Sequence, residues 1–200
     1  MARPPNPSIR ASLCDRAVDY VLSHGAGDLT LRPLAKVLKT NARMLVYHFG
    51  SREGLMRAIL SRIREREDAR IKGWFQSGQN PRTMSRFLRW FWKRSTAPRL
   101  RPAMRLLFEL YALALRNPQA YPGVLEDPLA YWQKLTEKAR IPAKPDAVEA
   151  TLLLAATRGL LLDLCATGDR ARVERAMEAL AQFVEWRTTS TEMVGGRQRG

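Results

Sequence analysis

Apolar side chains recur every three or four residues along nearly the whole chain, and this helical period limits the fold more than any other feature. No convincing run of alternating polar and β-branched residues, the pattern of a half-buried strand, interrupts it. Glycine and proline residues separate the periodic segments from one another. We therefore predict an all-α fold.

Helices are expected at about residues 9–24, 31–38, 42–48, 52–72, 129–140, 147–166 and 170–187. Apolar stripes at 84–91 and 104–115 indicate two more, the second ending near residue 117. The residues placed to cap them are Ser8, Thr30, Asn41, Ser51, Asp146 and Asp169. Gly25 and Gly168 are expected to close the helices that precede them. By domain, we predict a flexible N-terminus (residues 1–8), a helix-turn-helix domain (9–60), a second helical domain (61–187) and a disordered tail (188–200).

A chain of 200 residues with 46% hydrophobic side chains can bury a sizeable core. Arg158 and Asp163 interrupt its most apolar stretch, so we expect no membrane span, and residues 1–7 lack the apolar block of a signal peptide. The two cysteines, Cys14 and Cys165, lie far apart in helical contexts and are expected to be core residues, not a disulfide or a metal site. We expect a cytoplasmic protein without cofactor.

Basic residues outnumber acidic ones by 34 to 19, a formal net charge of +15 that favours a polyanionic partner. Residues 1–72 carry 14 basic and 7 acidic groups, residues 73–145 carry 13 and 4, and residues 146–200 carry 7 and 8. The uneven distribution suggests that nucleic-acid contact and self-association belong to different parts of the chain. From residue 69 to 108 no acidic residue occurs, and this basic stretch is either a solvated face or a site for anions.

Residues 30–55 have the spacing of a helix-turn-helix: a helix of about eight residues, a three-residue turn and a second short helix. The side chains expected to face inward are Leu34, Ala35, Leu38, Leu45 and Phe49. The second helix, which could place its N-terminal residues against base edges in a major groove, is expected to expose Arg43, Val46, Tyr47 and His48.

With Tyr47-His48-Phe49 near the end of the second helix and Arg52 opening the next, residues 9–60 resemble the TetR family of transcriptional regulators. The resemblance implies a homodimer that binds operator DNA, more often as a repressor, and a C-terminal domain that binds a small-molecule effector and dimerises. Two positions depart from the family pattern. Lys39 stands at a turn position usually held by glycine, so we expect it in a left-handed conformation at a modest cost in backbone energy. Val46 stands where an aromatic residue is common.

Carried over to this chain, the resemblance makes Thr40, Asn41 and Arg43 groove-facing, and Tyr47, His48 and Arg52 contacts to the DNA backbone. The full set of expected DNA-binding residues is Thr30, Arg32, Lys39, Thr40, Asn41, Arg43, Tyr47, His48 and Arg52. Structural alternatives remain open: Tyr47 could cover the edge of the core, His48 could cap the helix C-terminus, and Arg43 could lie on a solvated face.

Two further sets are expected in the C-terminal part. The first could line a pocket for a flat or hydrophobic ligand: Phe87, Phe91, Leu107, Phe108, Tyr111, Trp132 and Arg158. The second could form the dimer interface on the helices at about 147–166 and 170–187: Leu153, Leu160, Leu164, Val173, Met177, Leu180 and Val184.

No glycine-rich phosphate loop and no cluster of histidine with cysteine or glutamate occurs in the sequence, so we expect neither an enzyme nor a metal site. Two other classes remain open: a helical small-molecule carrier with an incidental basic surface, and a basic protein that lies on an anionic membrane. Sequence-selective DNA binding would separate the regulator from both, because a net charge of +15 alone ensures some nonselective binding.

Overall fold

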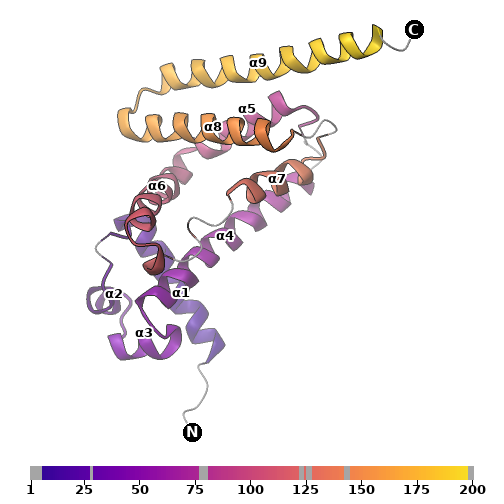
Figure 1. The fold of residues 1–200 in the computed structure, drawn as a ribbon. Helices are drawn as coiled ribbons and strands as arrows, with labels where there is room; N and C mark the ends of the chain where they lie inside the picture. The colour runs from indigo at the N-terminus through magenta and orange to yellow at the C-terminus, as the bar shows by residue number, and fades with distance from the viewer. Residues whose placement is uncertain are drawn as a thin grey trace. The chain divides into compact units, whose positions relative to one another are not determined.

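The computed structural model describes residues 6–27, 29–76, 81–121, 124, 128–141 and 145–197; at 76, 128 and 188–197 it describes the backbone alone. This part of the chain is helical and contains no strand, which confirms the predicted all-α class (Figure 1). The elements are α1 (Pro7–His24), α2 (Leu31–Val37), α3 (Ala42–Phe49), α4 (Arg52–Gln76), α5 (Met84–Ser95), η1 (Pro98–Leu100), α6 (Arg101–Arg116), η2 (Pro118–Ala120), α7 (Pro128–Lys138), α8 (Ala147–Thr167) and α9 (Arg170–Arg197).

Most of the expected caps are present. The side chain of Asn41 accepts a hydrogen bond from the backbone N–H of Met44 at 2.9 Å, and Asp146 accepts one from Glu149 at 2.8 Å. Gly168 closes α8 in the left-handed conformation, with φ at 72°. The cap of α1 was misplaced, because Asn6 caps it instead of Ser8 and accepts from the Ser8 N–H at 3.0 Å.

The chain divides into two compact units that do not coincide with the predicted domains. The first comprises residues 1–73 and 102–126, and the second comprises residues 74–101 and 127–200. The predicted boundary after residue 60 falls inside α4, which is one continuous helix. The predicted disordered tail is also corrected, because α9 continues through Arg197; residues 198–200 lie outside the described ranges. Residues 188–194 contain no glycine or proline that would end the helix.

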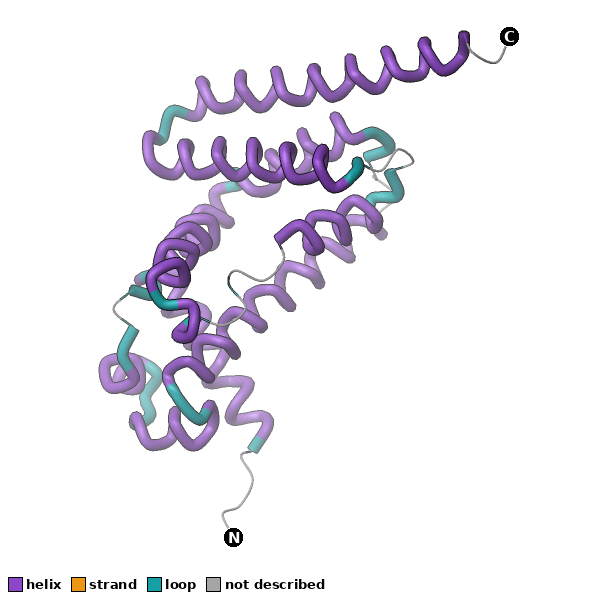
Figure 2. The backbone as a smooth tube through the Cα atoms, in the orientation of Figure 1, coloured by secondary structure: helices purple, strands orange, loops and turns teal. Residues whose placement is uncertain are grey.

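In the first unit, α2 and α3 form a pair joined by a short turn (Figure 2). They share one apolar core with α1, α4 and α6. Leu106 and Leu110 of α6 contribute to this core together with Val18 and Val21 of α1 and Ile59 of α4. A segment far along the chain therefore completes the fold of the N-terminal helices.

In the second unit, α5 packs on α9, and α8 packs on both α7 and α9. Arg89 of α5 donates to Glu178 of α9 at 2.7 Å and to Glu185 at 3.4 Å, so one member of the basic stretch has acidic partners from outside it. Arg172 of α9 likewise pairs with Asp163 of α8 at 2.7 Å.

By length and composition alone, α8 would be able to cross a membrane, although the sequence analysis expected no such segment. It contains only two charged residues between Glu149 and its end, Arg158 and Asp163. The core helices of soluble proteins satisfy the same criterion. In this structure 28% of the apolar window of α8 is buried: Leu153 and Leu161 are among the buried residues, whereas Leu152 and Leu162 are exposed.

Candidate nucleic-acid interface

Helices α2 and α3 meet through small and branched apolar side chains. The five residues predicted to face inward are all buried, with exposed fractions of 8% or less: Leu34, Ala35, Leu38, Leu45 and Phe49. Ala35 lies where α2 approaches the turn, and its carbonyl accepts a hydrogen bond from the N–H of Thr40 at 2.9 Å. A larger side chain at this position would push the two helices apart.

The turn between the helices depends on Lys39, which adopts φ of 51°. Glycine adopts this left-handed conformation without steric strain, whereas in lysine the Cβ lies too close to the backbone, which raises the energy of the folded chain. The sequence prediction that Lys39 takes a left-handed conformation is confirmed. The side chain is exposed, so the strained position carries a positive charge into solvent beside α3.

The outer surface of this pair is polar and mostly basic. Asn41 caps α3, and the next turn exposes Arg43, followed by Val46 and Tyr47, which are 43% and 40% exposed. Thr40 is half-buried, while Thr30, Arg32 and Lys36 are exposed on the preceding segment. Because a helix N-terminus carries partial positive charge and free N–H groups, the start of α3 suits an anionic partner.

His48 does not belong to this surface. It was predicted to face outward, but only 5% of it is exposed, and its ring packs against Tyr47 and Phe49. Within the described residues, neither ring nitrogen has a hydrogen-bond partner. The sequence placed His48 on the wrong face because it adjoins Tyr47 near the helix end, where burial depends on α1: Arg10 donates to the His48 carbonyl at 3.2 Å.

Arg52 makes hydrogen bonds within the first unit. Its Nε donates to the carbonyl of Leu29 at 2.7 Å, and Nη2 donates to the hydroxyl of Tyr121 at 3.0 Å. The guanidinium carbon lies 5.5 Å from the centroid of the Tyr121 ring. These contacts use two of the five guanidinium N–H donors, and the side chain is half-buried, so Arg52 supports the segment before α2 while its predicted contact to DNA phosphate stays a prediction.

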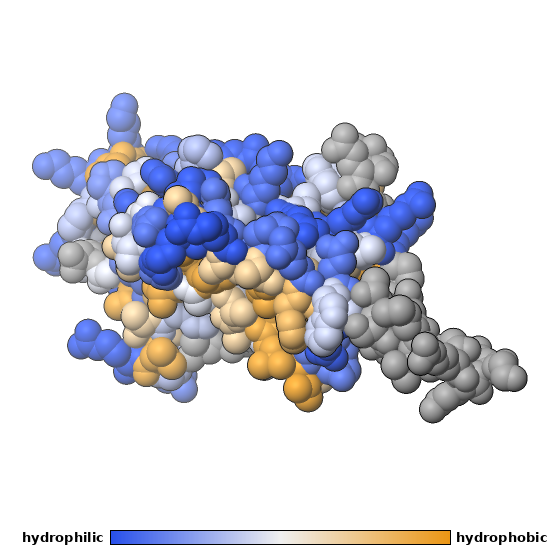
Figure 3. Space-filling model, turned by 90° about the horizontal axis from the view of Figure 1, so that it is seen from above, coloured by the Kyte–Doolittle hydropathy of each residue, from blue (hydrophilic) through white to orange (hydrophobic). Residues whose placement is uncertain are grey.

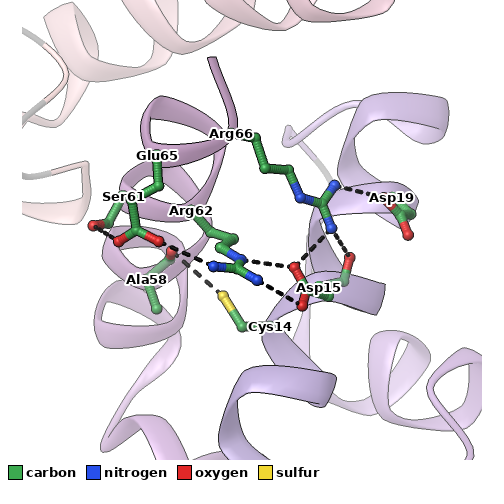
Figure 4. Close-up of polar contacts among 8 residues, drawn as sticks. All are labelled: Cys14, Asp15, Asp19, Ala58, Ser61, Arg62, Glu65 and Arg66. Atoms are coloured by element: carbon green, nitrogen blue, oxygen red, sulfur yellow. Dashed lines mark hydrogen bonds and ion pairs between the residues drawn. The ribbon is translucent and has the colours of Figure 1, made fainter. Parts of the chain in front are cut away.

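A cluster of ion pairs joins α1 to α4 in the first unit (Figure 4). Arg62 binds both carboxylate oxygens of Asp15, at 2.7 and 3.0 Å, and Arg66 reaches Asp15 at 2.7 Å and Asp19 at 2.9 Å. These hydrogen bonds lower the pKa of Asp15 to about 2. Beside the cluster, burial raises the pKa of the Cys14 thiol, as is typical of an unreactive core cysteine.

The expected pocket residues divide between the two units. Phe87, Phe91, Trp132 and Arg158 lie in the second unit, whereas Leu107, Phe108 and Tyr111 lie on the part of α6 that belongs to the first. Trp132 contacts Phe87 and Phe91 with ring centroids 5.2 and 5.0 Å apart. Its indole N–H is buried and has no hydrogen-bond partner within the described residues.

Four of the seven expected dimer residues have almost no surface left for a partner. Leu153, Val173, Met177 and Val184 are 0–4% exposed within a single protomer, so these four assignments are corrected. Leu160, Leu164 and Leu180 are half-buried. The reason is packing of α5 and α7 on the face of α8 and α9 that the sequence analysis took to be outward.

The large apolar residues that α8 and α9 expose are different ones: Val148, Leu152, Leu162, Phe183 and Trp186, each at least 50% exposed. On α8 the exposed positions 148, 152, 155, 159 and 162 recur at helical spacing and fall on one face. Figure 3, with α9 toward the viewer, shows apolar side chains gathered beside a hydrophilic band. The spacing was visible in the sequence, but α8 is apolar on nearly every side, and periodicity alone could not separate its two faces.

No protein-family model matches the chain, and no curated protein sequence matches it. Among solved structures, it is similar to the crystal structure of the multidrug binding protein EbrR in complex with imidazole. The two are 25% identical in sequence with a TM-score of 0.69, over 92% of this chain and 94% of that one. The likeness therefore extends into both units.

Within the described residues, no group of His, Cys, Asp and Glu side chains could hold a metal ion.

Proposed function

We propose that this protein is a homodimeric, cytoplasmic transcriptional repressor that binds a pseudo-palindromic operator through α2 and α3 and is released by a small-molecule effector. The observation that carries the proposal is the α2–α3 pair, whose apolar side chains are buried while the N-terminal end of α3 exposes Arg43 beside Asn41. The resemblance of residues 9–60 to the TetR family supports the same function.

In this proposal Arg43 reads base edges, because a guanidinium can donate two parallel hydrogen bonds to guanine. Thr40 and Asn41 lie beside it; Asn41 uses its oxygen to cap α3, which leaves its amide N–H groups for DNA. The remaining exposed residues, which would contact phosphates and fix the register of the helix, are Thr30, Arg32, Lys39 and Tyr47. His48 is buried and supports the domain, and the half-buried Arg52 would add a phosphate contact through its remaining N–H donors.

The proposed dimer forms through the exposed apolar face of α8 and α9, which we call the α8–α9 face: Val148, Leu152, Leu162, Phe183 and Trp186. Large apolar residues grouped on one face mark interaction sites, and a two-fold axis lets the same face serve both partners. Ala155 and Gly159 are exposed between the larger residues and would let the two helices approach closely. Two recognition helices related by this axis require a pseudo-palindromic site.

The proposed effector is apolar and at least partly aromatic. The aromatic residues of α5 and α7 cluster in the second unit, where the Trp132 N–H is the buried donor that a ligand acceptor could satisfy. The similar protein EbrR is described as multidrug binding, which supports a ligand-responsive protein here. Of the expected pocket set, the residues of the second unit are retained as a proposal: Phe87, Phe91, Trp132 and Arg158.

The test is selection of binding sites from random double-stranded DNA with the purified chain. We expect enrichment of a palindromic sequence, and Arg43→Ala should lose about 1–3 kcal/mol on that site while relaxing discrimination at one base pair of each half. Arg86→Ala removes an equally exposed arginine from α5 and is the matched control. If no sequence is enriched and all DNAs bind equally, the basic surface alone explains binding, and a carrier or a membrane-surface protein becomes the better reading.

A further inference from the structure

The loop between α1 and α2 is held by a side chain that lies more than 80 residues away in the sequence. One carboxylate oxygen of Glu109, on α6, accepts hydrogen bonds from the backbone N–H groups of Ala26 at 2.9 Å and of Gly27 at 2.6 Å. Gly25 has φ of 86°, and a Cβ there would lie 2.9 Å from the Glu109 carboxylate. The loop backbone and the carboxylate are therefore fitted closely to each other.

The end of the same loop is held from a second direction. Arg52 binds the carbonyl of Leu29 at 2.7 Å and the hydroxyl of Tyr121 at 3.0 Å, so Tyr121 fixes the guanidinium that fixes the loop. Tyr121 is 6% exposed and belongs to the core of the first unit, as do Ala26 and Leu29. We call these contacts the loop clasp: Glu109 to Ala26 and Gly27, and Tyr121 through Arg52 to Leu29.

Helix α2 depends on this clasp because it has little support of its own. It spans only seven residues, and Thr30 at its start makes no side-chain capping hydrogen bond. Helices of this length are unstable without tertiary contacts, so the position of the preceding loop sets where α2 begins. Since α3 packs on α2 through a short turn, the clasp also sets the orientation of the recognition helix.

We propose that Glu109 and Tyr121 are positioning residues for operator recognition: neither touches DNA, and both hold α2 and α3 in the orientation that lets Arg43 reach base edges. This inference rests on the proposed function. It follows that residues 1–73 alone would not make a complete recognition unit, because the clasp is supplied by residues 109 and 121. Base reading needs placement to within a fraction of an ångström, whereas nonselective phosphate contact does not.

The experiment compares affinity for the selected operator with affinity for scrambled DNA, in the full-length chain. Glu109→Ala should lower operator affinity at least tenfold with little change on scrambled DNA and an unchanged salt slope. Glu109→Gln should restore most of the loss, since the amide oxygen can still accept from both N–H groups. Tyr121→Phe keeps the ring but removes the hydroxyl, and it should lower operator affinity a few-fold.

Asp68→Asn on α4 is the control for loss of one negative charge, because Asp68 is exposed and lies outside the clasp. Amide hydrogen exchange gives an independent readout: Glu109→Ala should speed exchange at Ala26 and Gly27. The inference is overturned if Glu109→Ala and Tyr121→Phe bind the operator as the wild type does. It is equally overturned if both variants lose operator and scrambled binding in parallel with a lower melting temperature. If the wild type selects no sequence, the proposed function itself fails.

Discussion

The α2–α3 pair and the α8–α9 pair differ in how many of their apolar side chains are exposed to solvent. In α2 and α3 five apolar residues are buried and the exposed surface is largely polar and basic, with Val37, Val46 and Tyr47 as exceptions. Helices α8 and α9 bury one apolar face within the protomer and leave a second apolar face exposed. The first surface suits a charged, hydrated partner, and the second suits a partner that removes it from water.

The two faces of α8 can be tested at adjacent residues. Leu153 is 4% exposed, so Leu153→Arg would bury an unpaired charge in the second unit. We expect the largest effect here, a loss of about 3–5 kcal/mol in the free energy of unfolding. Urea unfolding followed by circular dichroism measures it. An unchanged unfolding midpoint would contradict the assignment of this face to the protomer core.

Its neighbour Leu152 is 63% exposed on the α8–α9 face. Leu152→Arg should leave the unfolding free energy of the protomer within about 0.5 kcal/mol. It should convert the dimer to a monomer in light scattering and lower operator affinity on the order of a hundredfold, because two linked DNA-binding domains become one. A variant that stays dimeric, or a monomeric wild type that binds the palindrome tightly, would remove the α8–α9 face as the interface.

Two glycines of α4 test how tightly the recognition unit is packed. A Cβ at Gly54 would overlap the carbonyl oxygen of Phe49 at the end of α3, so Gly54→Ala should cost about 1–3 kcal/mol of stability. Gly73 has nothing within 4 Å of the equivalent position, and Gly73→Ala should instead stabilise by up to about 1 kcal/mol. Thermal unfolding of the two variants distinguishes them, and equal shifts would argue against close packing of α3 on α4.

A substitution at Lys39 is expected to change stability and DNA affinity in opposite directions. Lys39→Gly removes a left-handed lysine and should raise the free energy of unfolding by about 1 kcal/mol. It also removes one positive charge beside α3, so operator affinity should fall and the magnitude of the salt slope should decrease by about one unit. A variant that is stabilised with no change in salt slope would place Lys39 outside the DNA contact.

The smallest expected effect is the pH dependence of the α1–α4 ion pairs. Hydrogen bonds from Arg62 and Arg66 lower the pKa of Asp15 from 3.8 to about 2 in the folded chain. Its contribution to stability is therefore complete above the unfolded pKa and is lost as pH falls through the folded one. The wild type should exceed Asp15→Asn in stability at about pH 6, and the difference should shrink as pH falls and disappear at about pH 1, below the folded pKa. A difference that persists at about pH 1 would show that the carboxylate charge is not its source.

The Arg52–Tyr121 pair and the Glu109 contacts join segments 69 and more than 80 residues apart. No periodic pattern or short motif predicts such pairs, because each partner on its own is an ordinary polar residue on a helix or a turn. This is why the sequence assigned Arg52 to DNA and left Glu109 and Tyr121 without a role.

By itself, the sequence determined the helices, most of their caps and the inward residues of the helix-turn-helix, since these depend on neighbours within about four residues. Asn41 and Gly168 were predicted in this way, and the resemblance to the TetR family predicted the left-handed Lys39. Tertiary structure alone decided that His48 is buried and that Leu152, not Leu153, is exposed. A side chain on a helix that is apolar on nearly every side becomes core or surface only through the helices that pack against it, and here those are contributed by distant parts of the chain.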